Sequence, residues 1–304
     1  IKNDELFDSI VPILLDKVRE GVEVRILCDG MGGRFMPKKR WDQMRRAGIK
    51  VGVFFPPFLG WLNLRVNYRN HRKIVVVDGA AGFVGGFNIG REYISRDPKF
   101  GYWRDTHLEI KGEAAISLQI RFALDWNYVT GENLFKEIRY FGEEAEYARR
   151  RLNGRIHAVW PDPEHVSEMV CMQIITSGPD TREPHIRNNY LELFHKAKHH
   201  IYIQTPYFIP DDAIFSSLKI AALSGVDVRL MIPCKPDHPF VYWATCSYAG
   251  ELLDYGARVY VYENGFLHSK GIMVDGRVSC YGTANMDIRS FELNFEVNAT
   301  IYDE

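Results

Sequence analysis

Polar and apolar residues alternate along several short runs of the chain, and each run follows a stretch with helical periodicity. The runs GVEVRIL at 21–27 and AGIKVGVF at 47–54 predict half-buried β-strands, because side chains alternate between the two faces of a strand. Matching runs, GVDVRLM and YGARVYVY, return at 225–231 and 255–262. Helix followed by strand, twice in each half, predicts an α/β lobe that occurs twice in the chain. The interval between the copies, about 200 residues, is far longer than the period of a solenoid.

A polar pattern inside the repeat recurs with the same spacing. In the first copy, NHRKIVVVDGAAGFVGGFNIG at 70–90, His71, Lys73 and Asp78 form H-x-K-x4-D, and Asn88 follows. The second copy keeps this spacing in four residues: His268, Lys270, Asp275 and Asn285. Two matches that also share the asparagine are not a chance event, so the pattern indicates a duplicated functional site.

Strand geometry brings the polar groups of each copy together. Residues two apart lie on one face of a strand, about 7 Å apart, so the imidazole and the ammonium point toward the same place. The run after them reads as a buried strand that ends in a hairpin dipeptide, Asp-Gly, at Asp78 and Asp275. Both aspartates are therefore interpreted as structural. The return arm of each hairpin is expected to bring the asparagine back beside the histidine and the lysine.

Composition narrows the range of functions. The 304 residues, 46% of them apolar, suffice for one large core or two modest ones. A net charge of −1 argues against a protein that mainly holds nucleic acid. A basic cluster between Arg34 and Arg46 is interpreted either as a solvated helix face or as a surface for anionic lipid.

A metal site or another cofactor has little support in the sequence. The five cysteines include no C-x-x-C pair, and no H-E-x-x-H occurs, so neither a disulfide framework nor a zinc site is predicted. Phosphodiester exchange needs a nucleophile, a proton donor and positive charge on the phosphoryl oxygens. Two histidines, two lysines and two asparagines meet these needs without a metal. No run of eighteen apolar residues exists, so these residues are not expected to span a bilayer.

The duplicated motif, with the G-x-x-N that follows it, resembles the phospholipase D superfamily. The phrases YRNHRKIVVVDG, FGYWRDTHL, IYIQTPYFIPDD, IPCKPDHPFVYWA, GFLHSK and GTANMDIRSFELNFEVN are similar to bacterial cardiolipin synthases over nearly the whole chain. The resemblance implies two α/β lobes related by a pseudo-twofold axis, each a mixed sheet flanked by helices, with one active site at their interface. It also implies transphosphatidylation. The phosphatidyl group of one phosphatidylglycerol passes through a phosphohistidine to a second, giving cardiolipin and glycerol without a cofactor.

The resemblance also implies roles for the motif residues. His71 is assigned as the nucleophile and His268 as the general acid and base, although the sequence itself is symmetric and leaves that choice open. Lys73 and Lys270 are assigned as catalytic residues that place positive charge on the phosphoryl oxygens, and Asn88 and Asn285 as phosphate-binding residues.

Two carboxylates complete the expected site. Asp105 in WRDTHLEI aligns with Glu296 in NFEVNATI, and similar positions in the family orient the histidines. A nucleophilic imidazole is usually held in one tautomer by such a carboxylate. The alternative is an ordinary carboxylate on a strand. Thr283 stands where the first copy has Gly86, so only the second site is expected to offer a hydroxyl to phosphate.

The copies also predict the domain organisation. The second copy opens with a strong strand pattern, HHIYIQTPYFIPDD at 199–212, that has no equivalent in the first. The apolar stretch 54–64 is interpreted as core packing, or else as an acyl-chain groove or interfacial anchor. The similar synthases carry N-terminal membrane helices, which would precede this chain and hold it at the bacterial cell membrane. The expected units are a first lobe lacking its opening strand, a connector and a second lobe: 1–129, 130–169 and 170–304.

Three alternative functions stay open. A hydrolytic phospholipase D would share the chemistry and use water as the acceptor. A nucleic-acid phosphodiesterase of the same superfamily is disfavoured by the near-neutral charge. A lipid-binding scaffold without turnover is disfavoured because both motifs are intact. The expected partners are phosphatidylglycerol and a membrane surface, with no nucleic acid, and the oligomeric state is left open.

Overall fold

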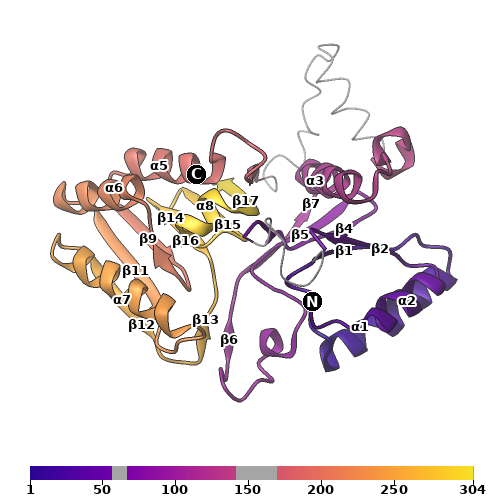
Figure 1. The fold of residues 1–304 in the computed structure, drawn as a ribbon. Coiled ribbons are helices and arrows are strands. Elements are labelled where there is room, and N and C mark those ends of the chain that lie inside the picture. The colour runs from indigo at the N-terminus through magenta and orange to yellow at the C-terminus, as the bar shows by residue number, and fades with distance from the viewer. Residues whose placement is uncertain (57–66, 142–169, 304) are drawn as a thin grey trace, which may run out of the picture.

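The computed structural model describes residues 1–56, 67–141 and 170–303, and these residues form two lobes (Figure 1). The N-terminal lobe, indigo to magenta, lies beside the C-terminal lobe, orange to yellow. Each lobe contains a helix–strand–helix–strand run that is followed by a β-hairpin. The predicted α/β fold with two related lobes is confirmed.

The second lobe is built on a mixed sheet. Its strands run in the order β12-β11-β9-β14-β15-β17, and β8 pairs with β17. The first three are parallel and the other pairs are antiparallel. The strands have these bounds: β8 (Cys171–Ser177), β9 (His200–Gln204), β11 (Asp227–Pro233), β12 (Arg258–Tyr262), β14 (Gly271–Val274), β15 (Val278–Gly282) and β17 (Asn294–Tyr302).

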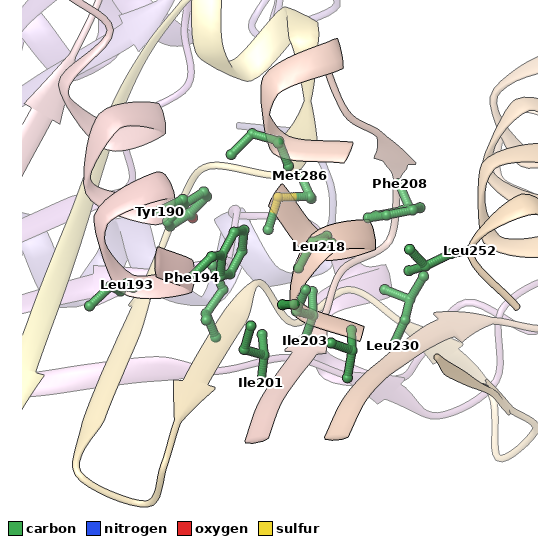
Figure 2. Close-up of a cluster of buried hydrophobic side chains, with 14 of the residues drawn as sticks. Tyr190, Leu193, Phe194, Ile201, Ile203, Phe208, Leu218, Leu230, Leu252 and Met286 are labelled. Carbon is green, nitrogen blue, oxygen red and sulfur yellow. The ribbon is translucent and has the colours of Figure 1, made fainter. Parts of the chain in front are cut away.

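The helices of this lobe share one hydrophobic core with the sheet (Figure 2). Ile201 and Ile203 on β9 are buried against it, while Tyr202 between them faces the other side. Full burial of one such side chain contributes roughly 1.5–3 kcal/mol relative to exposure. Side chains of three long helices contribute to this core: α5 (His185–Lys196), α6 (Asp212–Leu223) and α7 (Pro239–Leu253).

The first lobe repeats this plan with its sheet divided in two. β1 (Arg25–Asp29) and β2 (Lys50–Phe54) form a parallel pair. A separate antiparallel sheet contains β4 (Ile74–Val77), β5 (Ala81–Gly85) and β7 (His107–Lys111). In the second lobe β9 joins the corresponding strands, and no counterpart of β9 is present among the described strands of the first lobe. The helical segments are α1 (Glu5–Arg19), α2 (Lys38–Arg46), α3 (Glu113–Thr130) and the 3-10 turns η1 (Arg91–Ile94), η2 (Leu134–Lys136) and η3 (Ile138–Tyr140).

The lobes exchange short strands across their interface. β3 (Arg69–Asn70) of the first lobe pairs in parallel with the start of β17. β13 (Phe266–Leu267) of the second lobe pairs in parallel with β6 (Trp103–Arg104) of the first. Each exchanged strand lies directly before one of the motif histidines, so the interface itself positions both of them. The second lobe also contains β10 (Phe208–Ile209), β16 (Met286–Asp287) and α8 (Ile288–Glu292).

Two sequence expectations fall on parts of the chain outside this description. The apolar stretch 54–64 is described only as far as residue 56, and the expected connector 130–169 only as far as residue 141. The limits of the lobes at 129 and 170 therefore stay predictions.

Candidate active site

Both H-x-K motifs directly precede a β-hairpin that turns at Asp-Gly. The turn residues have positive φ, 54° at Asp78 and at Asp275, and 70° at Gly79 and at Gly276. The carboxylate of Asp275 accepts the backbone N–H groups of three residues before and at the start of β9: Lys198, His199 and His200. These are contacts of a turn residue, which supports the structural interpretation of Asp275.

His71 is held by the opposite lobe. Its Nδ1 lies 2.9 Å from both carboxylate oxygens of Glu296, which is fully buried on β17. The backbone N–H of His71 donates to the carbonyl of Phe295 at 3.0 Å, continuing the pairing of β3 with β17. An Nδ1–H directed at a carboxylate leaves Nε2 as the unprotonated nitrogen.

His268 shows the reciprocal arrangement. Its Nδ1 lies 2.6 Å from Oδ2 of Asp105 in the first lobe. Its backbone N–H donates to the carbonyl of Arg104 at 2.7 Å, continuing the pairing of β13 with β6. The alignment of Asp105 with Glu296 predicted that both acids lie near histidines, but the exchange between lobes was not foreseen. It depends on the short pairs β3–β17 and β13–β6, for which the sequence gives no signal.

The two carboxylates have different supporting contacts. Thr283 donates its hydroxyl to Glu296 at 2.5 Å, and Asn294 donates an amide hydrogen to the same carboxylate at 3.1 Å. Asp105 accepts the backbone N–H of Thr106 at 2.8 Å and lies 3.4 Å from the indole nitrogen of Trp103. Thr283 therefore contacts the carboxylate that holds His71, and its contact with phosphate stays a prediction.

Both motif lysines are buried beside their own histidines. Lys73 donates to the carbonyl of His71 at 2.7 Å, and Lys270 donates to the carbonyl of His268 at 2.5 Å. Burial lowers the pKa of Lys73 to about 7 and the pKa of Lys270 to about 8, because the charged form loses its hydration. The nearby carboxylates Glu296 and Asp105 oppose this shift.

The histidines are kept neutral at rest, and they differ in exposure. Burial lowers the pKa of His71, and burial together with the charge of Lys270 lowers the pKa of His268 to about 4. The paired carboxylates raise both values in part. The side chain of His71 is 27% exposed and that of His268 is 9% exposed. Glu296 and Asp105 have lowered pKa values despite the opposing effect of burial, because each faces one histidine and one lysine.

The two motif asparagines occupy different surroundings. Asn88 donates to the hydroxyl of Tyr93 at 2.5 Å, and the Tyr93 ring stands edge-on to His268 with 5.5 Å between the ring centroids. Asn285 is buried with its amide nitrogen 3.5 Å from Asp287, and its amide oxygen has no partner among the described residues. Burial raises the pKa of Asp287 to about 6. Contact of either asparagine with phosphate stays a prediction.

Sequence reasoning missed several neighbours of the histidines. Trp103 and Phe266 pack near the His268 ring, with centroids 5.0 and 6.2 Å away. Arg72 and Ser269 stand between H and K in their motifs, and both reach the opposite lobe. Their positions in the motif were visible in the sequence, but their contacts were not.

Metal-binding clusters and membrane-spanning helices are both lacking in residues 1–56, 67–141 and 170–303. In these segments no group of three or more His, Cys, Asp or Glu side chains lies together in a way that could hold a metal ion. In the same segments no helix has the length and apolar character needed to cross a membrane.

Two duplicated lobes with exchanged strands and a histidine pair between them define a protein with the phospholipase D type of fold. A family model described as "Cardiolipin synthase, PLD-like domain" matches residues 6–111 and 190–304, and the chain belongs to this family. It is 49% identical to the major cardiolipin synthase ClsA of Bacillus subtilis over 99% of this chain and 59% of that protein. It is 51% identical to a cardiolipin synthase of Staphylococcus aureus over 100% of this chain and 58% of that protein. The chain thus spans less than two thirds of the relatives it matches.

Solved structures support the same fold at low sequence identity. A phosphatidylserine synthase of Haemophilus influenzae superposes with a TM-score of 0.58 at 16% identity, over 97% of this chain and 80% of that one. A polyphosphate kinase of Porphyromonas gingivalis gives a TM-score of 0.57 at 14% identity, over 100% of this chain and 39% of that one. These two proteins have different names and a common architecture, so the fold alone does not decide the reaction.

Proposed function

We propose that this chain catalyses cardiolipin synthesis by transphosphatidylation between two molecules of phosphatidylglycerol. The observation that carries the proposal is the reciprocal pairing of His71 with Glu296 and of His268 with Asp105. Each pairing occupies Nδ1 of one imidazole and leaves Nε2 for chemistry. The names of the relatives at about half identity supply the substrate class.

The first half-reaction forms a covalent intermediate on His71. Nε2 of His71 attacks phosphorus, the P–N bond forms, and the bond from phosphorus to the glycerol oxygen of the headgroup breaks. His268 gives its proton to that oxygen, so glycerol leaves as a neutral alcohol. Glu296 stabilises the positive charge that develops on His71.

The second half-reaction transfers the phosphatidyl group. The headgroup hydroxyl of a second phosphatidylglycerol gives its proton to His268 and attacks phosphorus. The P–N bond breaks, neutral His71 is restored, and cardiolipin is released. His268 thereby regains the proton that it lost in the first half-reaction, and the cycle is balanced.

Substrate binding supplies the protonation states that these steps need. At rest the pKa of His268 is about 4, which leaves it unprotonated near neutral pH. A phosphodiester anion beside the imidazole favours the charged form and raises this pKa, because an opposite charge nearby stabilises the imidazolium. The same anion holds Lys73 and Lys270 in their charged forms, and their ammonium groups offset charge on the phosphoryl oxygens.

The reaction is placed at the surface of the cell membrane, because its substrate is a bilayer lipid. The basic cluster predicted from the sequence is supported by exposed Arg34, Lys38 and Lys39. Phe35 is 78% exposed, and the Arg34 guanidinium lies 4.6 Å from the centre of its ring. An apolar ring among basic side chains suits the boundary between anionic headgroups and acyl chains.

Product analysis tests the reaction. The chain is incubated with vesicles of labelled phosphatidylglycerol, and the lipids are separated by thin-layer chromatography and identified by mass. We expect cardiolipin and free glycerol in equal amounts, and neither with the His71→Asn variant. Phosphatidic acid with glycerol and no cardiolipin would show a hydrolytic phospholipase D instead. No turnover by a folded chain that still binds the vesicles would favour the lipid-binding scaffold.

A further inference from the structure

Arg72 is a buried cation that joins the two lobes. It stands between His71 and Lys73, and its side chain is 3% exposed. Its Nη1 donates to both oxygens of Asp125 on α3, at 2.8 and 2.9 Å. Its Nε donates to the backbone carbonyl of Glu296 at 3.2 Å, and its Nη2 to the carbonyl of Ser177 at 3.2 Å. One guanidinium thus ties a helix of the first lobe to two strands of the second.

Asp125 is itself fixed from several sides. Besides the hydrogen bonds from Arg72, its carboxylate accepts one from Arg121 on the preceding turn of α3 at 2.7 Å. It also lies 3.4 Å from the amide nitrogen of Asn70. Within the described residues, the guanidinium of Arg121 reaches no acceptor on the second lobe. The carboxylate therefore anchors Arg72, whose guanidinium links it to the backbone of β17.

A buried ion pair contributes little to the stability of an interface, since the loss of hydration offsets much of the attraction between the two charges. The planar fork of arginine does hold several acceptors in fixed directions, which a lysine does not. One of these acceptors is the backbone of Glu296, and the side chain of Glu296 holds His71. The hydrogen bonds of Arg72 therefore orient the groups that they contact more than they stabilise the interface.

The second copy has an uncharged counterpart of this link between the lobes. Ser269, the residue between H and K there, lies 2.7 Å from the hydroxyl of Thr106 in the first lobe. Thr106 follows Asp105, the carboxylate that holds His268. In both copies the residue between H and K reaches the segment that carries the other lobe's acid, β17 at Glu296 and the link between β6 and β7 at Asp105, but a buried cation does so at the His71 side and a hydroxyl at the His268 side.

We propose that Arg72, anchored by Asp125, is a positioning residue that sets the Glu296 carboxylate against Nδ1 of His71. It acts through the backbone of β17 and not on the substrate. Its kinetic consequence rests on the proposed function, whereas its effect on the His71 ring does not. The charged groups that face this ring are Glu296 from β17, Lys73 from the same motif and Lys270 from the second lobe.

The test compares Arg72→Lys with the matched control Arg121→Lys, both of which keep the positive charge. The pKa of His71 is measured by NMR titration of the chain labelled in histidine, with His268 as internal reference. Glu296 raises the pKa of His71, so loss of its alignment in Arg72→Lys should lower that pKa by at least half a unit. Arg121→Lys should leave it unchanged. Turnover of phosphatidylglycerol should fall by roughly 10–100-fold in kcat in Arg72→Lys, with KM little changed.

Each outcome decides between positioning and plain support of the interface. A lower unfolding midpoint with an unaltered His71 pKa would show that Arg72 only stabilises the interface, and the proposal would be wrong. If Arg72→Lys does not fold, Asp125→Asn keeps the shape of the anchor and should lower the His71 pKa in the same direction; an unaltered value there also overturns the proposal. A lowered His71 pKa in a chain without turnover would keep this inference and reject the proposed function.

Discussion

The two histidine half-sites are related by duplication, yet different residues hold the histidine in each. At His71 the acid is a glutamate with three side-chain neighbours: His71 itself, Thr283 and Asn294. At His268 the acid is the shorter Asp105, held by the backbone of Thr106. The longer acid accompanies the more exposed imidazole and the shorter acid the more enclosed one. Duplication has preserved the chemical groups while each copy acquired its own support.

A single position explains part of this difference. A Cβ added at Gly86 would lie 2.0 Å from Oδ1 of Asp105, so any side chain there would displace the carboxylate. In the second copy Glu296 leaves room for Thr283, whose hydroxyl donates to it. Gly86 and Thr283 are thus matched to the acids beside them.

The comparison supports a division of labour. His71 is more open to solvent, and its Nδ1 is shared between two oxygens of one carboxylate, which suits a nitrogen that must carry phosphorus. His268 is enclosed, with Tyr93 edge-on to its ring and Lys270 against its Nδ1 at 2.9 Å. An enclosed imidazole with a lowered pKa suits proton transfer. The assignment of nucleophile and acid stays a prediction.

Replacing each histidine with asparagine should give the largest effects. Turnover should fall by several orders of magnitude in both variants, because each removes an essential step. The losses should differ in kind with a nitrophenyl phosphodiester, whose leaving group needs no proton. We expect a burst of nitrophenol from His268→Asn and none from His71→Asn. A burst only from His71→Asn would reverse the two roles. Equal bursts would contradict the division of labour between the histidines.

Removing charge from the acids should give the next largest effects. Glu296→Gln and Asp105→Asn keep the shape of each side chain but favour the wrong tautomer of the histidine in the opposite lobe. We expect kcat to fall by roughly 10²–10⁴-fold in each. NMR should show that Glu296→Gln lowers the pKa of His71 and that Asp105→Asn lowers the pKa of His268. A shift at the histidine of the same lobe would contradict the exchange between lobes.

The residues that differ between the copies should give smaller effects. Gly86→Ala should displace Asp105 and lower kcat by roughly 10–100-fold. Thr283→Val removes a hydrogen bond to a charged group and should lower the free energy of unfolding by about 1.5–3 kcal/mol. Denaturant titration measures the change in unfolding free energy, and steady-state kinetics measures the change in kcat. Full activity of a folded Gly86→Ala chain would show that the Asp105 carboxylate does not need a glycine at position 86.

The pH dependence should give the smallest effect. The folded-state pKa values of Lys73 and Lys270, about 7 and 8, lie below the usual 10.5, so their positive charge is lost as the pH rises through this range. The fall of kcat/KM for the free enzyme, which begins with the loss of the His268 proton above its pKa of about 4, should therefore steepen from about pH 7 upward. The decline in kcat should begin at higher pH, because the bound phosphodiester anion raises both pKa values. A kcat/KM whose fall does not steepen up to pH 9.5 would show that neither lysine must be charged.

Sequence reasoning reached the fold and the motif groups because both depend on local patterns. Alternation of apolar residues located strands such as β1, β11 and β12 within a few positions, and duplication identified both H-x-K motifs. Partners across the interface were beyond its reach, since a two-residue pairing such as β3 with β17 leaves no periodic trace. For the same reason the contacts of Arg72 and Thr283 could not be assigned from spacing alone.

The identity of the phosphorylated side chain tests the central claim most directly. The chain is mixed with labelled phosphatidylglycerol, quenched within one turnover, and digested under conditions that keep phosphohistidine intact. The account predicts label on the peptide containing His71, both in the unaltered chain and in His268→Asn with a nitrophenyl substrate. Label on the peptide containing His268 would contradict the assignment of the nucleophile, and turnover without label on either histidine would contradict the covalent route.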